Sequence, residues 1–291
     1  ATTEIYTLSL HDALPIYDKD NVLSPATVRG YDYMLRNCFE SIKYLPIKKI
    51  DETVIQQLAN TNAKHYSAKS ISNQLGFISA VLKKYKIKID FDDITKKPKE
   101  KKEIIIPTEK EVKMLLEASK NTNIEIPIIL AALCGLRQSE IAACTWDKVN
   151  GNILKVKGAI VPNRENKLTN KATNKSYSGT RDIILIDYAA ERLSILKGNK
   201  KEGTMSTMIP SSVLRALKHL CRSLHIPEYT MHSLRHYHAS VMLSINIPDK
   251  YAMKILGQNS PYMLKTTYQH IFSEEYLKVN AKINDHYSDL S

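Results

Sequence analysis

Residues 126–140, IPIILAALCGLRQSE, join a long apolar run to an arginine and a glutamate. The run from Ile126 to Leu136 is too continuous for a surface helix, so we expect it to lie in a protein core. A guanidinium at the edge of a core is costly without an anionic partner, and Glu140 follows Arg137 at a spacing that pairs side chains on a helix. The stretch predicts a helical core with a charged site at its rim. Arg137 there is either a structural ion pair or a ligand for an anion.

Helical patterns precede this core. Ser24 is placed to cap a helix that has Pro25 at its first position, and Asp51 is placed to cap the next one. Thr108 and Glu111 form a capping-box pattern at the start of a later helix. Apolar residues at spacings of three and four predict the buried faces: Val28, Tyr31, Leu35 and Phe39 in the first helix, and Ile71, Leu75, Ile78 and Val81 or Leu82 in a third.

A lysine-rich segment divides the chain. With 291 residues the protein is long enough for two domains, which we place at residues 17–94 and 107–291 with a linker at 95–106. Residues 95–103, TKKPKEKKE, contain no large apolar side chain and cannot bury enough surface to fold. The segment is either a solvated loop or a strap along a phosphate backbone. In the second case its lysines contact DNA: Lys96, Lys97, Lys99, Lys101 and Lys102.

The first sixteen residues are treated separately. Residues 6–16, YTLSLHDALPI, can be written codon for codon as a common adaptor of short-read sequencing libraries. We therefore hypothesise that residues 1–16 are a translated adaptor and leave them out of the fold prediction.

The overall charge favours a polyanionic partner. Lys and Arg number 42 against 30 Asp and Glu, which gives a net charge of +12 and makes nucleic acid the first candidate. The four cysteines are scattered without a CxxC pair, as expected for reduced cysteines in a cytoplasmic protein. No apolar run approaches the roughly 20 residues that span a bilayer, so we expect no membrane partner.

A β-hairpin is expected in the second domain. Residues 152–161 and 180–187 are strand-like, and the polar residues between them predict a long hairpin that carries lysines. The residues after Asp187 are helical, with breaks near Gly198, Pro227, Pro248 and Gly257. The fold class predicted is mainly α with one small antiparallel β-sheet.

Residues 231–240, MHSLRHYHAS, place three histidines and an arginine on one helix. His232, Arg235 and His236 share one side, and an apolar stripe is expected opposite: Leu234, Tyr237, Val241 and Ile245. A metal site is disfavoured, because the glutamate of HExxH and a nearby third ligand are missing. A solvated helix face and a phosphate site stay open. In the second case we expect His236 to support the site and His238 to be a bystander.

The motifs GLRQSE, HSLRH and LGQNSPYMLKTTYQH, in this order, resemble the tyrosine recombinase (phage integrase) family, in the style of integrases of phages and conjugative transposons. The resemblance runs from about Leu23 to the last residue. It implies a helical, SAM-like core-binding domain at 17–94 and a tyrosine-recombinase catalytic domain at 107–291. It also implies a site-specific recombinase that integrates or excises a mobile element.

The resemblance also implies residue roles. Tyr268 is the nucleophile that forms a 3′-phosphotyrosyl ester, while Arg137 and Arg235 bind the non-bridging phosphate oxygens. His232 lies near the phosphate as donor or proton acceptor. A hairpin lysine protonates the leaving oxygen, and this is Lys175, with Lys171 as its rival and otherwise a DNA contact. Gln258 departs from the family, which usually has a histidine there; an amide donates hydrogen bonds but does not ionise.

The partners implied are double-stranded DNA attachment sites, a homotetramer on two sites and an accessory directionality factor. No metal or nucleotide cofactor is implied, because the cleaved bond is stored in the tyrosyl ester. The protein is expected in the cytoplasm, encoded by a bacterium, phage or mobile element. Two alternatives remain: a type IB topoisomerase-like enzyme, and a catalytically weakened DNA-binding factor, which Gln258 alone favours.

Overall fold

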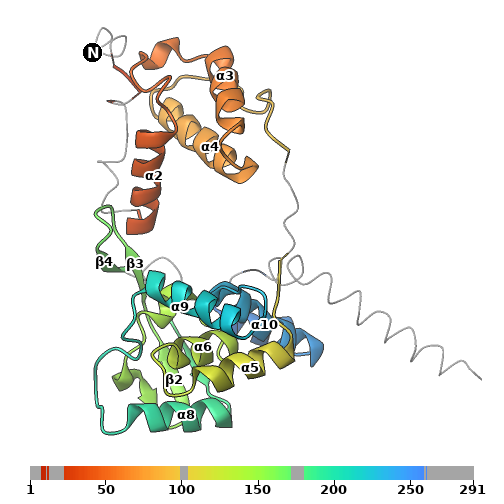
Figure 1. The fold of residues 1–291 in the computed structure, drawn as a ribbon. Helices are drawn as coiled ribbons and strands as arrows, with labels where there is room; N and C mark the ends of the chain where they lie inside the picture. Colours follow the sequence, from red (N-terminus) through yellow and green to blue (C-terminus); the bar gives the residue numbers. More distant parts are fainter. Residues whose placement is uncertain are drawn as a thin grey trace, which may run out of the picture. The chain divides into compact units, whose positions relative to one another are not determined.

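The computed structural model describes residues 8–10, 12, 23–98, 104–171, 180–258 and 260. The chain divides into two compact units: unit 1 contains residues 1–103 and 161–169, and unit 2 contains residues 104–160 and 170–291 (Figure 1). The break at 103/104 falls inside the expected linker. Each unit is described by itself. Lys99, Lys101, Lys102, Lys175 and Tyr268 lie outside the described residues.

In the residues of unit 1 that the structure describes, the helices are α2 (Pro25–Asn37), the short 3₁₀ helix η2 (Ile47–Lys49), α3 (Glu52–Ala63) and α4 (Ala68–Lys84). The expected caps are confirmed. Ser24 Oγ accepts a hydrogen bond from the Thr27 amide, and Asp51 Oδ1 accepts one from the Val54 amide. Capping satisfies amides that have no partner inside the helix, so these residues set where the helices begin.

The core of unit 1 follows the predicted faces, with one difference. Both Val81 and Leu82 of α4 are buried. Helix α2 ends at Asn37, so Phe39 follows the helix instead of belonging to it. Phe39 nevertheless reaches the core, where its ring stacks on Phe77 with the centroids 5.7 Å apart. The apolar spacing therefore identified the buried residues better than the helix end.

Unit 1 also includes the tip of a β-hairpin, which the sequence pattern had placed in the second domain. Strands β3 (Ala159–Pro162) and β4 (Leu168–Lys171) form a two-stranded sheet. In the turn between them, Arg164 Nη2 lies 2.9 Å from Asp32 Oδ1 of α2, and Arg29 Nε donates to Asn166 Oδ1 at 2.9 Å. The described residues thus contain a second small sheet in addition to the expected one, because the polar segment contains a hairpin of its own.

Unit 2 is mainly helical with a small antiparallel sheet. Its elements are α5 (Glu109–Ser119), α6 (Glu125–Ala132), α7 (Gln138–Ile141), η3 (Trp146–Lys148), β1 (Val149–Asn150), β2 (Ile153–Val156), β5 (Arg181–Ile184), α8 (Asp187–Lys197), α9 (Pro210–Ser223), α10 (Met231–Ser244) and α11 (Asp249–Leu256). The sheet order is β1-β2-β5, and β2 pairs antiparallel with β5, with Val156 opposite Arg181. The pairing of the two strand-like segments and the fold class are confirmed.

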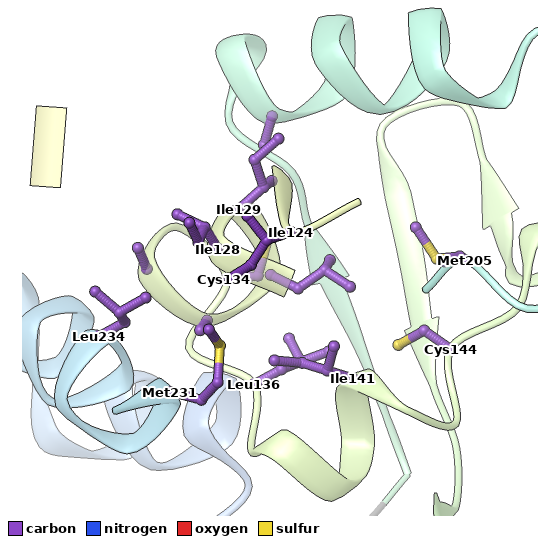
Figure 2. Packing of buried hydrophobic residues seen from close by; sticks show 14 of the residues in the cluster. Ile124, Ile128, Ile129, Cys134, Leu136, Ile141, Cys144, Met205, Met231 and Leu234 are labelled. Carbon is purple, nitrogen blue, oxygen red and sulfur yellow. The ribbon is translucent and has the colours of Figure 1, made fainter. Parts of the chain in front are cut away.

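The apolar run that ends at Leu136 lies at the centre of unit 2. Its residues from Pro127 to Ala132 are buried, and α10 packs against α6 (Figure 2). Met231 and Leu234 of α10 join this core, together with the free cysteines Cys134 and Cys144. The core therefore fixes the start of α10 beside the turn that carries Arg137.

The predicted apolar stripe of α10 was partly wrong. Leu234 is fully buried, but the side chain expected at the far end of the stripe, Ile245, is 62% exposed. Ala239 and Met242 are buried instead, in a second cluster with Ala252 and Leu256 of α11. Helix α10 packs against both α6 and α11, so two of its sides are covered and a single stripe cannot describe it. Over the described stretches, none of the helices has the length and apolarity needed to cross a membrane.

Candidate active site

Arg137 stands at the junction between the buried helix and the short helix α7. After α6 the chain turns at Gly135, whose φ is +66°, and Arg137 directly precedes Gln138, the first residue of α7. The Arg137 amide donates to Glu140 Oε2 at 3.0 Å, and Arg137 Nη1 donates to Glu140 Oε1 at 2.8 Å. The pairing expected from the sequence is confirmed. The Arg137 side chain keeps 37% of its surface exposed, so it remains accessible to a ligand.

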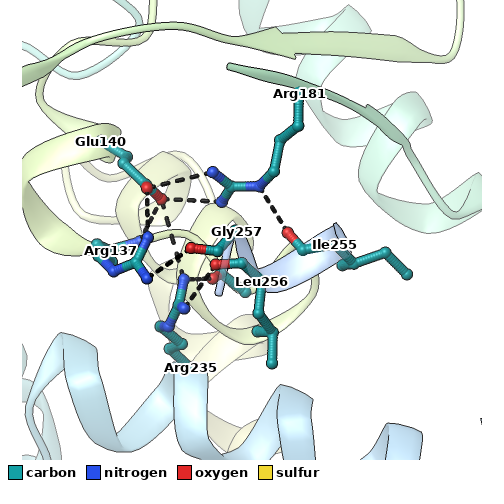
Figure 3. Close-up of polar contacts among 8 residues, drawn as sticks. Arg137, Glu140, Arg181, Arg235, Ile255, Leu256 and Gly257 are labelled. Carbon is teal, nitrogen blue, oxygen red and sulfur yellow. Dashed lines mark hydrogen bonds and ion pairs between the residues drawn. The ribbon is translucent and has the colours of Figure 1, made fainter. Parts of the chain in front are cut away.

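The C-terminal end of α11 accepts hydrogen bonds from arginines in three parts of the chain (Figure 3). The carbonyl of Ile255 accepts from Arg181 Nε at 2.6 Å, that of Leu256 from Arg235 Nη2 at 2.7 Å, and that of Gly257 from Arg137 Nη2 at 2.9 Å. Carbonyls at a helix C-terminus have no partner within the helix, and the helix dipole there favours cations.

Arg235 occupies the inner part of this site. Its side chain is only 3% exposed, its Nη1 donates to the carbonyl of Gly135, and the same atom lies 3.9 Å from Glu140 Oε2. The guanidinium group of Arg235 thus links the turn after α6 to the end of α11. Arg137 and Arg235, almost a hundred residues apart in sequence, are brought together.

Arg181 is a site residue that the sequence did not predict. Its Nη1 and Nη2 donate to Glu140 Oε1 and Oε2 at 3.2 and 2.9 Å, and its side chain is 3% exposed. A signal was present: Arg181 begins a strand in which it alternates with Asp182 and shares the inward side with the buried Ile183. An arginine at an inward strand position needs an anionic partner.

Glu140 is the carboxylate on which these arginines depend. Burial alone raises the pKa of its carboxyl, but the hydrogen bonds and charge of Arg181, together with those of Arg137, hold that pKa below its ordinary value. Three guanidinium groups surround this one carboxylate. The cluster therefore carries a net positive charge, which suits an anionic ligand.

The three histidines of α10 have different surroundings in the structure. The rings of His232 and His236 meet edge to face with centroids 4.5 Å apart. Loss of hydration around the His232 ring, and then the charges of Arg235 and Arg137, lower its pKa; burial, followed by the charge of His232, lowers the pKa of His236 to about 4. Both rings are therefore neutral at pH 7, and His232, which is exposed, is the accessible one.

His238, expected to be a bystander, has a packing role. A Cβ atom added to Gly135 would lie 2.7 Å from His238 Cδ2, so the imidazole occupies the space that this glycine leaves. Burial lowers the pKa of His238 to about 4. The neutral ring helps to hold α10 against the turn that carries Arg137.

Gln258 follows the α11 end directly. Gly257 adopts the left-handed conformation, and the Gln258 amide donates to the carbonyl of Met253 at 3.0 Å, which closes the helix with a tight turn. The side-chain oxygen Oε1 of Gln258 is buried and has no hydrogen-bond partner among the described residues. An orphaned buried polar atom is costly and calls for a functional reason.

The described lysines differ in what they contact. Lys96 is exposed, whereas Lys97 Nζ donates to the carbonyls of Ala63 and Tyr66 at 3.2 and 3.5 Å, at the C-terminal end of α3. Lys171 is the last residue of β4. In the portion of the chain that the structure describes, no three His, Cys, Asp or Glu side chains are grouped so as to hold a metal ion.

Comparison with known sequences gives a family match. Residues 106–275 match the family described as "Phage integrase family", a stretch that includes all the expected catalytic positions. A tyrosine recombinase XerC-like protein of Caldanaerobacter subterraneus subsp. tengcongensis is 20% identical over 311 aligned positions, covering 90% of this chain and 78% of the relative.

Solved structures share the fold. The Tn1549 transposon integrase in complex with transposon right end DNA superposes with a TM-score of 0.74 at 15% identity, covering 89% of this chain and 94% of that one. A lambda integrase tetramer bound to a Holliday junction gives a TM-score of 0.67 at 17% identity, with 89% and 80% covered.

Proposed function

Because the chain belongs to the phage integrase family of tyrosine recombinases, we propose that it cleaves and rejoins DNA strands through a covalent bond to Tyr268. The observation that carries the proposal is the meeting of Arg137 and Arg235 at the end of α11, directly before Gln258. Two guanidinium groups in one positively charged cluster match the non-bridging oxygens of a phosphodiester.

The proposed reaction is a transesterification. The phenolic oxygen of Tyr268 attacks the phosphorus, a bond forms between them, and the bond from phosphorus to the 5′-oxygen breaks. His232 accepts the phenolic proton or donates to the phosphate, and Lys175 gives a proton to the leaving 5′-oxygen, with Lys171 as the alternative donor. Arg137 and Arg235 stabilise the added charge of the transition state. Attack by a second 5′-hydroxyl reverses the step and joins a new strand.

The neutral state of His232 fits this role. Its lowered pKa leaves the ring unprotonated at pH 7, so it is able to accept a proton from a phenol whose own unperturbed pKa is near ~10. Once protonated, the imidazole becomes a donor to the phosphate beside Arg235. The bond energy is conserved in the tyrosyl ester, so the reaction needs no nucleotide.

The biological setting is part of the proposal. We place the protein in the cytoplasm, acting on double-stranded attachment sites as a homotetramer, during integration or excision of a mobile element. The solved relatives on transposon-end DNA and on a Holliday junction support this setting by fold. Residues 17–94 would be the core-binding domain, residues 95–106 a basic linker, and residues 1–16 a translated adaptor. A directionality factor would set the balance between the two directions.

The test uses a covalent trap. Binding sites are first selected from a random duplex library, and nicked versions of the selected duplexes are then incubated with the protein. The proposal expects a covalent protein–DNA adduct that disappears in Tyr268→Phe. An adduct that survives this change overturns the assignment of Tyr268 as the nucleophile. Absence of any adduct in the wild type favours a DNA-binding factor. Recombination between two sites, set against relaxation of a plasmid that carries none, separates a recombinase from a topoisomerase.

A further inference from the structure

Arg181 makes contacts that the proposed chemistry does not use. Its guanidinium donates through Nη1 and Nη2 to the two oxygens of Glu140 and through Nε to the carbonyl of Ile255 (Figure 3). Each of its three guanidinium nitrogens is therefore already engaged by Glu140 or Ile255, whereas the Arg137 side chain keeps 37% of its surface exposed. Any effect of Arg181 on the reaction must pass through the groups it holds.

The first such group is the Glu140 carboxylate. Arg181 binds both of its oxygens, which fixes the plane of the carboxylate. Arg137 binds the same two oxygens through its side chain and its backbone amide. The direction in which Arg137 points therefore depends on how Arg181 orients Glu140. Because Arg137 shares the carboxylate with Arg181 and Arg235, it is held less strongly than in an ion pair of two residues alone, which leaves it better able to bind a phosphate.

The second group is the end of α11. Ile255, Leu256 and Gly257 are consecutive, and each carbonyl binds a different arginine. By holding the carbonyl of Ile255, Arg181 helps to fix the carbonyls that bind Arg235 and Arg137, and the position of Gln258 that follows. We call Arg137 and Arg235 the phosphate clamp. The buried side chain of Arg181 thus contacts both Glu140 and the end of α11, which hold the clamp in place.

The third link is along the chain. Arg181 is the first residue of β5, paired with Val156 of β2, and it comes six residues after Lys175. The residue that contacts Glu140 and α11 is therefore itself held by the pairing of β5 with β2.

We propose that Arg181 is a positioning residue for strand cleavage: it holds Glu140 and the C-terminal end of α11 so that Arg137 and Arg235 engage one phosphate. This rests on the proposed function. Displacement of a reacting group by about 1 Å costs on the order of 10²-fold in rate, so small shifts of the clamp suffice for a large effect.

The experiment compares Arg181→Lys with a matched control, Arg192→Lys. Arg192 also binds a buried carboxylate in unit 2, with its Nε 2.7 Å from Glu125 Oε1, but its hydrogen bonds within the described residues go to Glu125 and Asn121 and none to α11 or Glu140. Covalent adduct formation is measured with excess protein on a nicked duplex, DNA affinity by fluorescence anisotropy, and folding by the emission of Trp146, the single tryptophan.

Arg181→Lys is expected to slow adduct formation about 10- to 100-fold at saturating protein, with DNA affinity changed less than about twofold. Arg192→Lys should leave the rate near that of the wild type. If Arg181 served only the fold, cleavage would slow only in proportion to the fraction of protein that is unfolded. That result overturns the proposal, and so does a wild-type cleavage rate in Arg181→Lys. Should Arg181→Lys unfold at the assay temperature, Arg181→Gln, which keeps donors for Glu140, is measured in its place.

A double-mutant cycle adds a readout that a structural role would not move. If Arg181 acts through Arg137, the rate loss in Arg137→Lys/Arg181→Lys is smaller than the product of the two single losses. Independent, multiplicative losses contradict the proposal. Failure of the proposed function is recognised separately, because the wild type would then form no Tyr268-dependent adduct in the same assay.

Discussion

The guanidinium of Arg235 donates a hydrogen bond to the backbone carbonyl of Gly135, one hundred residues earlier in the chain. Gly135 presents this carbonyl from a left-handed conformation with φ of +66°, which a glycine adopts without steric cost. The absent side chain also makes room for His238 and Leu256, whose nearest atoms would lie 2.7 and 2.9 Å from an added Cβ. The residue type at position 135 therefore sets how closely α10 and α11 approach the turn.

Gly135→Ala is expected to destabilise unit 2 by about 2 kcal/mol or more, because backbone strain and overpacking coincide. It should also slow strand cleavage by moving the acceptor of Arg235. Urea unfolding followed by Trp146 emission measures the first effect. Gly151→Ala is the control: its φ is +58° but no atom lies within 4 Å of the added Cβ, so it carries the strain alone, about 1 kcal/mol. Equal losses in the two variants would show that the packing argument is wrong.

Exchanging arginine for lysine should separate the two halves of the phosphate clamp. In Arg235→Lys a single ammonium replaces a buried guanidinium that binds the carbonyls of both Gly135 and Leu256. The free energy of unfolding should therefore fall by about 3 kcal/mol, and the cleavage rate should fall as well. In Arg137→Lys the half-exposed side chain costs less in folding, roughly 1 kcal/mol, while cleavage falls about 10²-fold. Adduct rates and urea midpoints of both variants test this. Equal destabilisation, or near-normal cleavage in Arg137→Lys, would contradict it.

Local signals in the sequence predicted much of this architecture. Helix caps at Ser24, Asp51 and Thr108, and the pairing of Arg137 with Glu140, involve residues only three positions apart, so their spacing is sufficient to identify them. The buried run before Leu136 was equally readable because it lacks polar residues.

Long-range packing could not be read in the same way. The hydrogen bond of Arg181 to Ile255 spans 74 positions and that of Arg137 to Gly257 spans 120, and no periodic pattern indicates which carbonyl an arginine will meet. The buried side of α10 was misassigned for a related reason. A stripe at helical spacing assumes one covering partner, and α10 has two.

Lys96 and Lys97 should contribute differently to DNA binding. Lys96 is exposed, so Lys96→Ala should weaken binding and reduce the slope of log affinity against log salt by about 1. Lys97 is bound to carbonyls at the end of α3, so Lys97→Ala should change the salt slope less. Anisotropy titrations at several salt concentrations compare the two variants. A larger slope change in Lys97→Ala would reverse this assignment.

The stability of unit 2 should depend on pH through Glu140. Its folded pKa is lowered from about 4.5, so the carboxylate stabilises the fold above that pH and the contribution is lost as pH falls through the folded pKa. Glu140→Gln lacks this contribution and leaves Arg181 without its anion, which should cost about 3–5 kcal/mol at pH 7. The difference in the free energy of unfolding between the wild type and Glu140→Gln should become smaller below about pH 4.5, as measured by Trp146 emission in urea. A difference that stays constant from neutral to acid pH would exclude Glu140 as the titrating group.

Gln258→Met should separate catalysis from folding at the position where the family usually has a histidine. Gln258 Oε1 is buried, and the part of the chain that the structure describes offers it no hydrogen-bond partner. An apolar side chain of similar length removes this unsatisfied atom and should leave stability unchanged or slightly higher. The amide donors are lost at the same time, so adduct formation should slow by about 10²-fold if they bind the phosphate. Gln258→His restores a donor that ionises near pH ~6.5 and should cleave faster at pH 6 than at pH 8. If Gln258→Met cleaves at the wild-type rate, the amide takes no part in the reaction and its buried oxygen is only a cost to folding.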